Sequence, residues 1–325
     1  MKVSYEARLS SLKTAVSKLV FFYGVPLGLF LFLALAALYL FVSHRSARPD
    51  FPRSAGDFMS AARAERRLAE LRGLIAADPS DMRLLAESGG LKYQLGPAFY
   101  VEAISDLERA RALGLADVSA FYYLGTMYQA VGLYDFAAQE YRKFLNNAPG
   151  DQEARMLLAK LCYASGDFPC AVREYEAVLA KRADDAVLLG NLALARWKNN
   201  QDHAAPLLKL RALDAQGRFL ADYVEGRIKY ELKDYSNASG FFAKAVASLA
   251  AAGEFPDKAG LFWLAGDAAY RNKETEPAYG YLQELLRLNP AHEEGKVLLA
   301  KIEKARKAAE KNKAKPAGKR SVSAK

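Results

Sequence analysis

Cysteine, histidine and tryptophan are scarce in this sequence of 325 residues, which holds two Cys, three His and two Trp. Two Cys exclude a scaffold built from several disulfides. His44, His203 and His292 lie far apart in the chain, which leaves no metal-ligand spacing and little acid–base equipment near neutral pH. No glycine-rich phosphate loop and no nucleophile elbow occurs in the sequence. We therefore expect no enzymatic activity, no metal and no cofactor.

Negative charge is in the minority, with 37 Asp and Glu against 46 Lys and Arg, which gives a net charge of +9. Residues 1–53 carry +5 and residues 301–325 carry +8, so residues 54–300 carry −4. A basic face cannot be assigned to this body, and no specific binding of nucleic acid is expected. Residues 1–18 form a basic N-terminal segment. Residues 312–325 are predicted to be a basic disordered tail that can contact anionic surfaces.

One long apolar run is present near the N-terminus. Residues Leu19 to Val42 include no charged side chain, and at about 1.5 Å per residue a helix of this length spans the ~30 Å hydrocarbon layer. A cleaved signal peptide is the alternative, but its apolar region is usually about 7–15 residues long and no small-residue cleavage site follows Val42. The sequence therefore predicts a transmembrane helix over residues 19–42.

The charges that flank this run predict its orientation. Four positive side chains precede it and three follow it, namely Lys2, Arg8, Lys13 and Lys18 against Arg45, Arg48 and Arg53. With the amino terminus added, the positive-inside rule favours an N-terminus in the cytoplasm and a large domain in the periplasm, anchored in a bacterial inner membrane. Residues 43–56 contain Pro49, Pro52 and Gly56 and are predicted to be a polar linker.

Apolar residues recur at helical spacing from Asp57 onward, without a run of alternating β-branched residues, so the sequence predicts an all-α body. Leu-Gly or Leu-Ala pairs follow one another every 34 residues, and a second small residue keeps step with them: Gly125, Ala159 and Ala193, then Ala137, Ala171 and Ala205. This pattern resembles the tetratricopeptide repeat (TPR). The resemblance implies helical hairpins that stack into a right-handed α-solenoid, since one hairpin cannot bury its apolar face alone.

The same register extends over residues 57–311. It predicts a leading helix over 57–77, repeats at about 82–117, 118–151, 152–185, 186–218, 219–258 and 259–292, and a capping helix over 293–311. The small residues that anchor the six units are Gly89, Gly125, Ala159, Ala193, Gly226 and Gly266. The fifth unit fits least well, because Asp222, Glu225 and Lys229 fall on positions that are normally buried.

The resemblance also implies a concave groove lined by the first helix of each unit. Its groove-facing positions lie three before, one after and four after the small residue. The candidate binding residues are therefore Tyr122, Tyr163, Lys160, Arg227, Trp263, Tyr270, Trp197 and Tyr230. We expect groove exposure for Tyr122, Tyr163, Trp263 and Tyr270, because neighbours such as Phe121 and Phe262 fill the buried positions. For Trp197 and Tyr230, core packing is an equal alternative.

Cys162 and Cys170 lie on the two helices of one predicted hairpin, on either side of a turn at Gly166. Their side chains could approach within disulfide range. In an oxidising periplasm the pair could form a disulfide, whereas in the cytosol both would be small buried hydrophobic side chains.

An aromatic groove without catalytic residues predicts a membrane-anchored scaffold for protein–protein interactions, in a bacterial envelope assembly or a secretion-related complex. Its partner would be a protein or peptide segment in the groove. The alternative is an accessory factor that binds polysaccharide or peptidoglycan through the same aromatics. Some TPR proteins clamp a C-terminal carboxylate with Lys and Asn. The matching positions here hold Tyr122 and Thr126, or Met156 and Lys160, so this mode is not expected.

Overall fold

A computed structural model describes residues 30, 32–36, 38–39 and 50–314 of the chain. These residues form helices and no strand, which confirms the predicted all-α class. Within the described residues, none of the helices meets the length and hydropathy that a membrane span requires. The basic segment 1–18, most of the predicted membrane helix 19–42, and residues 315–325 of the tail lie outside the described residues.

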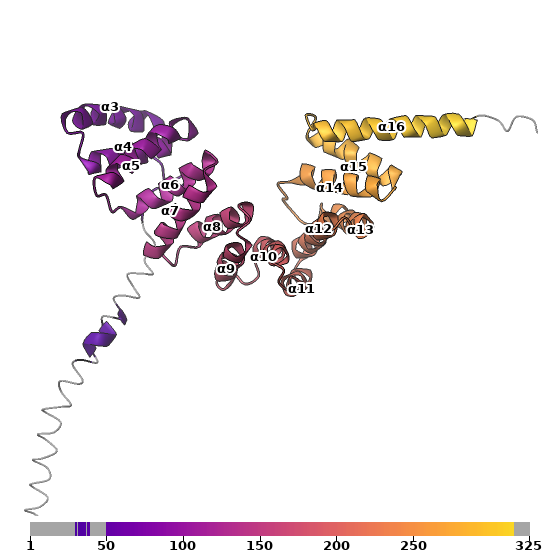
Figure 1. Cartoon of the computed structure of the whole chain (residues 1–325), viewed down its shortest axis with the longest axis horizontal. Helices are drawn as coiled ribbons and strands as arrows, with labels where there is room; N and C mark the ends of the chain where they lie inside the picture. Colours follow the sequence, from indigo (N-terminus) through magenta and orange to yellow (C-terminus); the bar gives the residue numbers. More distant parts are fainter. Residues whose placement is uncertain (1–29, 31, 37, 40–49, 315–325) are drawn as a thin grey trace, which may run out of the picture. The chain divides into compact units, whose positions relative to one another are not determined.

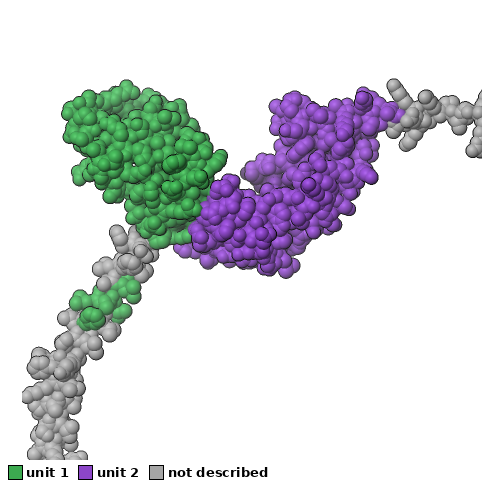
Figure 2. Space-filling view, viewed as in Figure 1, with its two compact units in different colours: residues 1–161 green, residues 162–325 purple. Residues whose placement is uncertain are grey.

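The described body consists of α-helices that follow one another along the chain, with short connections (Figure 1). Their bounds are α3 Ala61–Ala77, α4 Met82–Leu95, α5 Tyr100–Ala112, α6 Val118–Ala130, α7 Tyr134–Asn147, α8 Gln152–Ala164, α9 Phe168–Leu179, α10 Ala186–Lys198, α11 Ala204–Ala212, α12 Ala215–Glu231, α13 Tyr235–Ser248, α14 Lys258–Arg271, α15 Thr275–Leu288 and α16 Glu293–Ala314. A short 3-10 helix, η2, covers Pro97–Phe99. The chain divides into two compact units, Met1–Leu161 (unit 1) and Cys162–Lys325 (unit 2), coloured separately in Figure 2.

Aspartates lie at the N-termini of most of these helices, and this capping role accounts for many of the acidic residues between positions 54 and 300. In each case the carboxylate accepts a hydrogen bond from a backbone N–H of the first turn, satisfying a donor that the helix itself leaves unpaired. The capping residues are Asp81, Asp117, Asp151, Asp167, Asp185, Asp214, Asp234 and Asp257. Many carboxylates of the body therefore hold helix ends rather than a reaction centre.

The helices of a hairpin pack closely through the small residues that mark the repeat. A Cβ at Gly226 of α12 would lie 2.8 Å from the ring of Phe242 on α13, and one at Gly89 of α4 would lie 2.6 Å from the Leu107 side chain on α5. Such separations are too short for any side chain, so the paired helix occupies the space that a larger residue would need. The repeat of small residues in the sequence thus reflects close helix–helix contact.

The fifth repeat departs from the expected pattern. Helix α12 begins at Ala215, so the predicted boundary between residues 218 and 219 falls inside it. The carboxylates of Asp222 and Glu225 lie 3.0 and 3.1 Å from the guanidinium of Arg211 on α11. Their charge is accommodated because this neighbouring helix supplies a cation.

Candidate functional site

In unit 1, the chain's own N-terminal residues cover the aromatic positions of the predicted groove. We call residues 51–58 the strap. The Phe51 ring contacts the rings of Tyr122 and Tyr123 edge-on, with both centroid distances 5.4 Å. The backbone is held as well, because the Tyr123 hydroxyl donates to the Pro52 carbonyl at 3.0 Å. At the far end, the Phe58 ring lies 5.7 Å from that of Tyr93.

Arg53 supplies the charged contact of the strap. Its side chain is only 5% exposed, and its Nη1 lies 2.7 Å from Asp151 Oδ2 and 3.3 Å from Glu153 Oε2. The guanidinium also lies over the Tyr122 ring, 4.7 Å from its centroid. Since Tyr122 in turn donates its hydroxyl proton to Glu153 at 3.0 Å, the strap and the repeat share one polar network, in which Asp151 is buried and Glu153 is partly exposed.

Burial changes the acidity of the phenols under the strap. It raises the pKa of Tyr93 to about 12, with a smaller contribution from Tyr100. The pKa of Tyr122 is raised as well, first by burial and then by the negative charge of Glu153. Both hydroxyls therefore stay protonated as hydrogen-bond donors over the whole physiological pH range.

The prediction for Tyr122 was groove exposure, yet this side chain is 3% exposed and buried. Phe121, expected inside, is only half-buried. The physical reason is the strap, which brings Phe51 and Arg53 onto the face that Tyr122 lines. The predicted linker 43–56 is therefore part of the folded unit from Phe51 onward. A large aromatic residue beside Pro and Arg, within an otherwise polar stretch, was the available signal.

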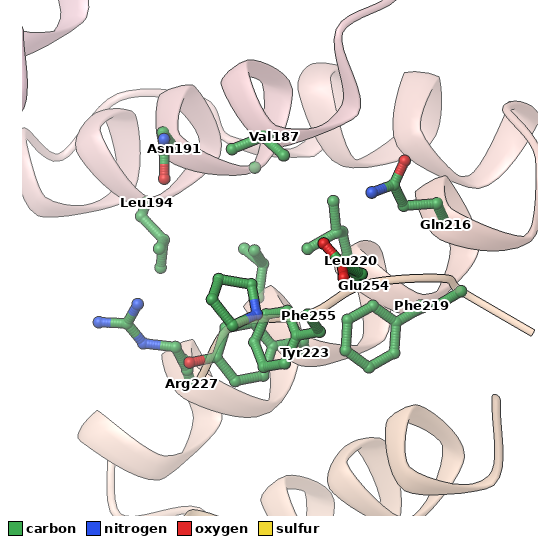
Figure 3. Close-up of a pocket in the computed structure, with 14 residues that line it drawn as sticks. Val187, Asn191, Leu194, Gln216, Phe219, Leu220, Tyr223, Arg227, Glu254 and Phe255 are labelled. Carbon is green, nitrogen blue, oxygen red and sulfur yellow. The ribbon is translucent and has the colours of Figure 1, made fainter. Parts of the chain in front are cut away.

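Unit 2 carries a pocket of about 180 Å³ on the corresponding face, drawn in Figure 3. Apolar side chains dominate its lining, joined by a few polar ones. The residues are Val187, Gly190, Asn191, Leu194, Gln216, Phe219, Leu220, Tyr223, Val224, Arg227, Ala252, Glu254, Phe255 and Pro256. They come from α10, from α12 and from the connection between α13 and α14.

Phe255 builds one wall of this pocket. Its ring lies edge-on to Phe219 and Tyr223, with centroid distances of 4.9 and 5.1 Å. The connection between α13 and α14 thus places an aromatic ring against α12. Phe255 was not predictable as a site residue, because a single aromatic residue within a loop shows no periodicity.

Arg227 is the positively charged group of the pocket. Its guanidinium lies 5.8 Å from the centroid of the Tyr223 ring. Burial raises the pKa of Tyr163 and of Tyr223, and the charge of Arg227 opposes that rise at both phenols. Within the described part of the chain, no carboxylate oxygen lies within 4 Å of the Arg227 guanidinium.

The other predicted groove residues lie in several environments. Lys160 is exposed, and Tyr163 is half-buried with its ring 5.6 Å from that of Phe168. The Lys198 ammonium lies 4.6 Å from the centroid of the half-buried Trp197 ring.

Three predicted residues pack towards the C-terminal end of unit 2. Tyr230 donates to Asp267 at 2.5 Å, which favours packing over groove exposure for this residue. Trp263 and Tyr270 are partly buried against the C-terminal apolar cluster, with Trp263 4.9 Å from the His292 ring. Of the predicted groove residues, Arg227 lines the pocket and its charge acts on Tyr163, whereas Tyr163, Trp263 and Tyr270 do not line it.

Cys162 and Cys170 form a disulfide that joins α8 to α9, with Cα atoms 5.7 Å apart. Both side chains are buried. The sequence allowed either a disulfide or two buried free cysteines, and the structure contains the disulfide.

Comparison with known proteins supports the fold. No family model and no curated protein matches the chain. Among solved structures, it is similar to yeast Tom70 (11% identity, TM-score 0.51, 76% of this chain and 52% of that chain). It is also similar to TPR proteins from Cytophaga hutchinsonii (18% identity, TM-score 0.49, 73% and 95%) and Parabacteroides merdae (15%, 0.49, 76% and 95%). The chain shares the all-α fold of Tom70. At these identities the likeness is limited to the fold.

Proposed function

We propose that this TPR chain is a scaffold for protein–protein interactions and that unit 2 provides its partner-binding surface. The observation that carries the proposal is the contrast between the two units. In unit 1 the strap covers Tyr122 and Tyr123, whereas in unit 2 the face that contains Tyr223 keeps a pocket. Helical repeats use such faces to bind extended segments of other proteins.

The composition of the pocket favours a peptide over a glycan. Val187, Leu194 and Leu220 give it aliphatic walls, and Arg227 gives it one cation. A glycan would require hydrogen-bonding groups along its length, which these aliphatic walls do not offer. We propose binding without catalysis, because the residues that line the pocket include no nucleophile paired with a base.

The test is binding of the purified full-length protein to a panel of unfolded polypeptides and to a panel of glycans, including peptidoglycan fragments. We expect binding to polypeptides that is weakened by Val187→Glu, a change at the pocket rim. Binding to glycans alone would contradict the proposal and favour the polysaccharide-binding alternative.

For the cellular setting we propose anchoring through residues 19–42 in a bacterial inner membrane, with the repeats in the periplasm, within an envelope assembly or secretion complex. The charge asymmetry around the apolar run supports this orientation. The Cys162–Cys170 disulfide also supports an oxidising compartment. A periplasm-active reporter enzyme fused after Lys325 should be active. Activity from a cytoplasm-active reporter alone would contradict the orientation.

A further inference from the structure

We propose that the unit 2 pocket receives a partner segment in which a large apolar side chain lies beside a carboxylate. The apolar side chain would enter between Leu194, Tyr223 and Phe255, and the carboxylate would pair with Arg227. This inference rests on the proposed function and specifies the chemistry of the partner.

The apolar part of the argument comes from the walls of the pocket. Val187 at the rim is 52% exposed, while Leu194, Leu220 and Tyr223 deeper in are each less than a tenth exposed. A cavity of about 180 Å³ admits a large side chain of a peptide and excludes a folded domain. Filling it with an apolar group removes exposed surface of Val187 and of the half-buried Phe255 from water, which favours binding.

The charged part comes from Arg227. Two other partly buried arginines are matched by carboxylates, Arg111 by Glu108 and Glu140 and Arg211 by Asp222 and Glu225. Arg227 has an aromatic neighbour and no carboxylate oxygen within 4 Å among the residues that the structure describes. A carboxylate from a partner can bind the planar guanidinium through two hydrogen bonds, a strong and directional contact.

Charge complementarity in unit 1 provides an internal precedent. There the groove contributes carboxylates, Asp151 and Glu153, and the segment that occupies it contributes the cation of Arg53. In unit 2 the cation belongs to the groove, so a complementary occupant contributes the carboxylate. Glu254 also lines the pocket, on the side nearer Gln216 and away from Arg227 (Figure 3). It disfavours a run of several acidic residues and favours one carboxylate directed at Arg227.

Phe255 holds the same place beside Tyr223 that Phe51 of the strap holds beside Tyr122. Tyr122 and Tyr223 lie three residues before Gly125 and Gly226, which is the same repeat position. Each contacts a Phe that follows an acidic residue and precedes Pro: Phe51 of Asp50-Phe51-Pro52 at 5.4 Å, and Phe255 of Glu254-Phe255-Pro256 at 5.1 Å. In both units the chain itself supplies this ring, so a partner side chain would enter the pocket beside Phe255 and not in its place.

The experiment selects ligands from a displayed library of random linear peptides against the purified full-length protein. Three variants are compared with the parent chain: Arg227→Glu, Val187→Glu and, as a matched control, Arg218→Glu. Arg218 lies on the same helix, is exposed and is not part of the pocket. Thermal unfolding of each variant shows that it is folded before binding is compared.

We expect the selected peptides to share a large apolar residue next to Asp or Glu. Arg227→Glu and Val187→Glu should each weaken their binding at least roughly tenfold, because each places a like charge against the carboxylate. Arg218→Glu should leave it unchanged. Arg227→Glu should also select basic peptides in a second round, a readout that simple loss of structure cannot produce.

Other results contradict the inference in distinguishable ways. Selected peptides that lack acidic residues, or that bind Arg227→Glu as well as the parent, overturn the inference and leave the proposed function standing. Failure to select any peptide contradicts the proposed function itself. Binding of free N-acetylphenylalanine with the same dependence on Arg227 as the peptides would reassign the pocket to small organic acids.

Discussion

Arg53 is buried between two carboxylates and an aromatic ring, and its removal tests whether the strap contributes to folding. Arg53→Ala leaves the carboxylate of Asp151, 1% exposed, without this cation. Removing one partner of a buried ion pair typically costs about 3–5 kcal/mol, and we expect a loss in this range for the free energy of unfolding of unit 1. Chemical denaturation followed by circular dichroism measures it.

The matched control is Arg83→Ala on the surface of α4, where the side chain is exposed. A surface substitution of this kind changes stability by less than about 0.5 kcal/mol. If both variants unfold at the same denaturant concentration, the ion pair with Asp151 does not stabilise the unit.

Because the phenols under the strap are buried, we expect the free energy of unfolding of unit 1 to fall at alkaline pH. Burial raises the pKa of Tyr93 to about 12, so the folded state favours the neutral phenol. Its contribution is complete below the unfolded value of about 10 and is lost as the pH rises from there through about 12. Near-ultraviolet titration of phenolate should therefore show part of the tyrosines ionising later in the native protein than in urea. Superimposable native and unfolded titrations would contradict this account.

At the scale of a helix pair, two glycines provide a matched test of packing. Gly226 on α12 faces Phe242, whereas a Cβ at Gly240 on α13 would meet nothing within 4 Å. Gly240→Ala should stabilise unit 2 by about 0.5–1 kcal/mol through the higher helix propensity of Ala. Gly226→Ala should instead destabilise it by about 1–3 kcal/mol, because the added methyl group displaces a buried ring.

Thermal unfolding of the two glycine variants, compared with the parent chain, measures both effects. Opposite shifts of the melting temperature are expected. A stabilising shift from Gly226→Ala would mean that the α12–α13 pair is packed less closely than the structure indicates.

The helices were predictable from the sequence, but the covering of the groove was not. A 34-residue period depends on local spacing, and it placed the small residues that pack in each hairpin, including Gly226 beside Phe242. The strap depends on contacts between Phe51 and residues about 70 positions later, which no local pattern encodes. For this reason Tyr122 was assigned to the groove surface although it is buried. Arg227 was identified because its repeat position faces the same side as the pocket.

At the scale of the whole molecule, the two units are built from similar helices, but the aromatic face is covered in unit 1 and carries a pocket in unit 2. Unit 1 uses its own strap to cover the face, with the acidic pair Asp151 and Glu153 receiving Arg53. Unit 2 leaves a pocket with Arg227 beside an apolar wall. The same repeat architecture thus serves internal attachment in one unit and, in our proposal, recognition of a partner in the other.

Site-specific photo-crosslinking tests most directly whether unit 1 binds its own strap and unit 2 binds a partner. A photoreactive phenylalanine analogue is placed at Asn191 in the unit 2 pocket or at Tyr123 in unit 1; each lies two residues before the small residue of its repeat. After irradiation in cells, mass spectrometry identifies the crosslinked peptides. From position 191 we expect adducts with a segment of another protein in which a large apolar residue lies beside Asp or Glu, and from position 123 adducts with residues 51–53 of the same chain. Partner adducts from position 123 and none from position 191 would contradict it.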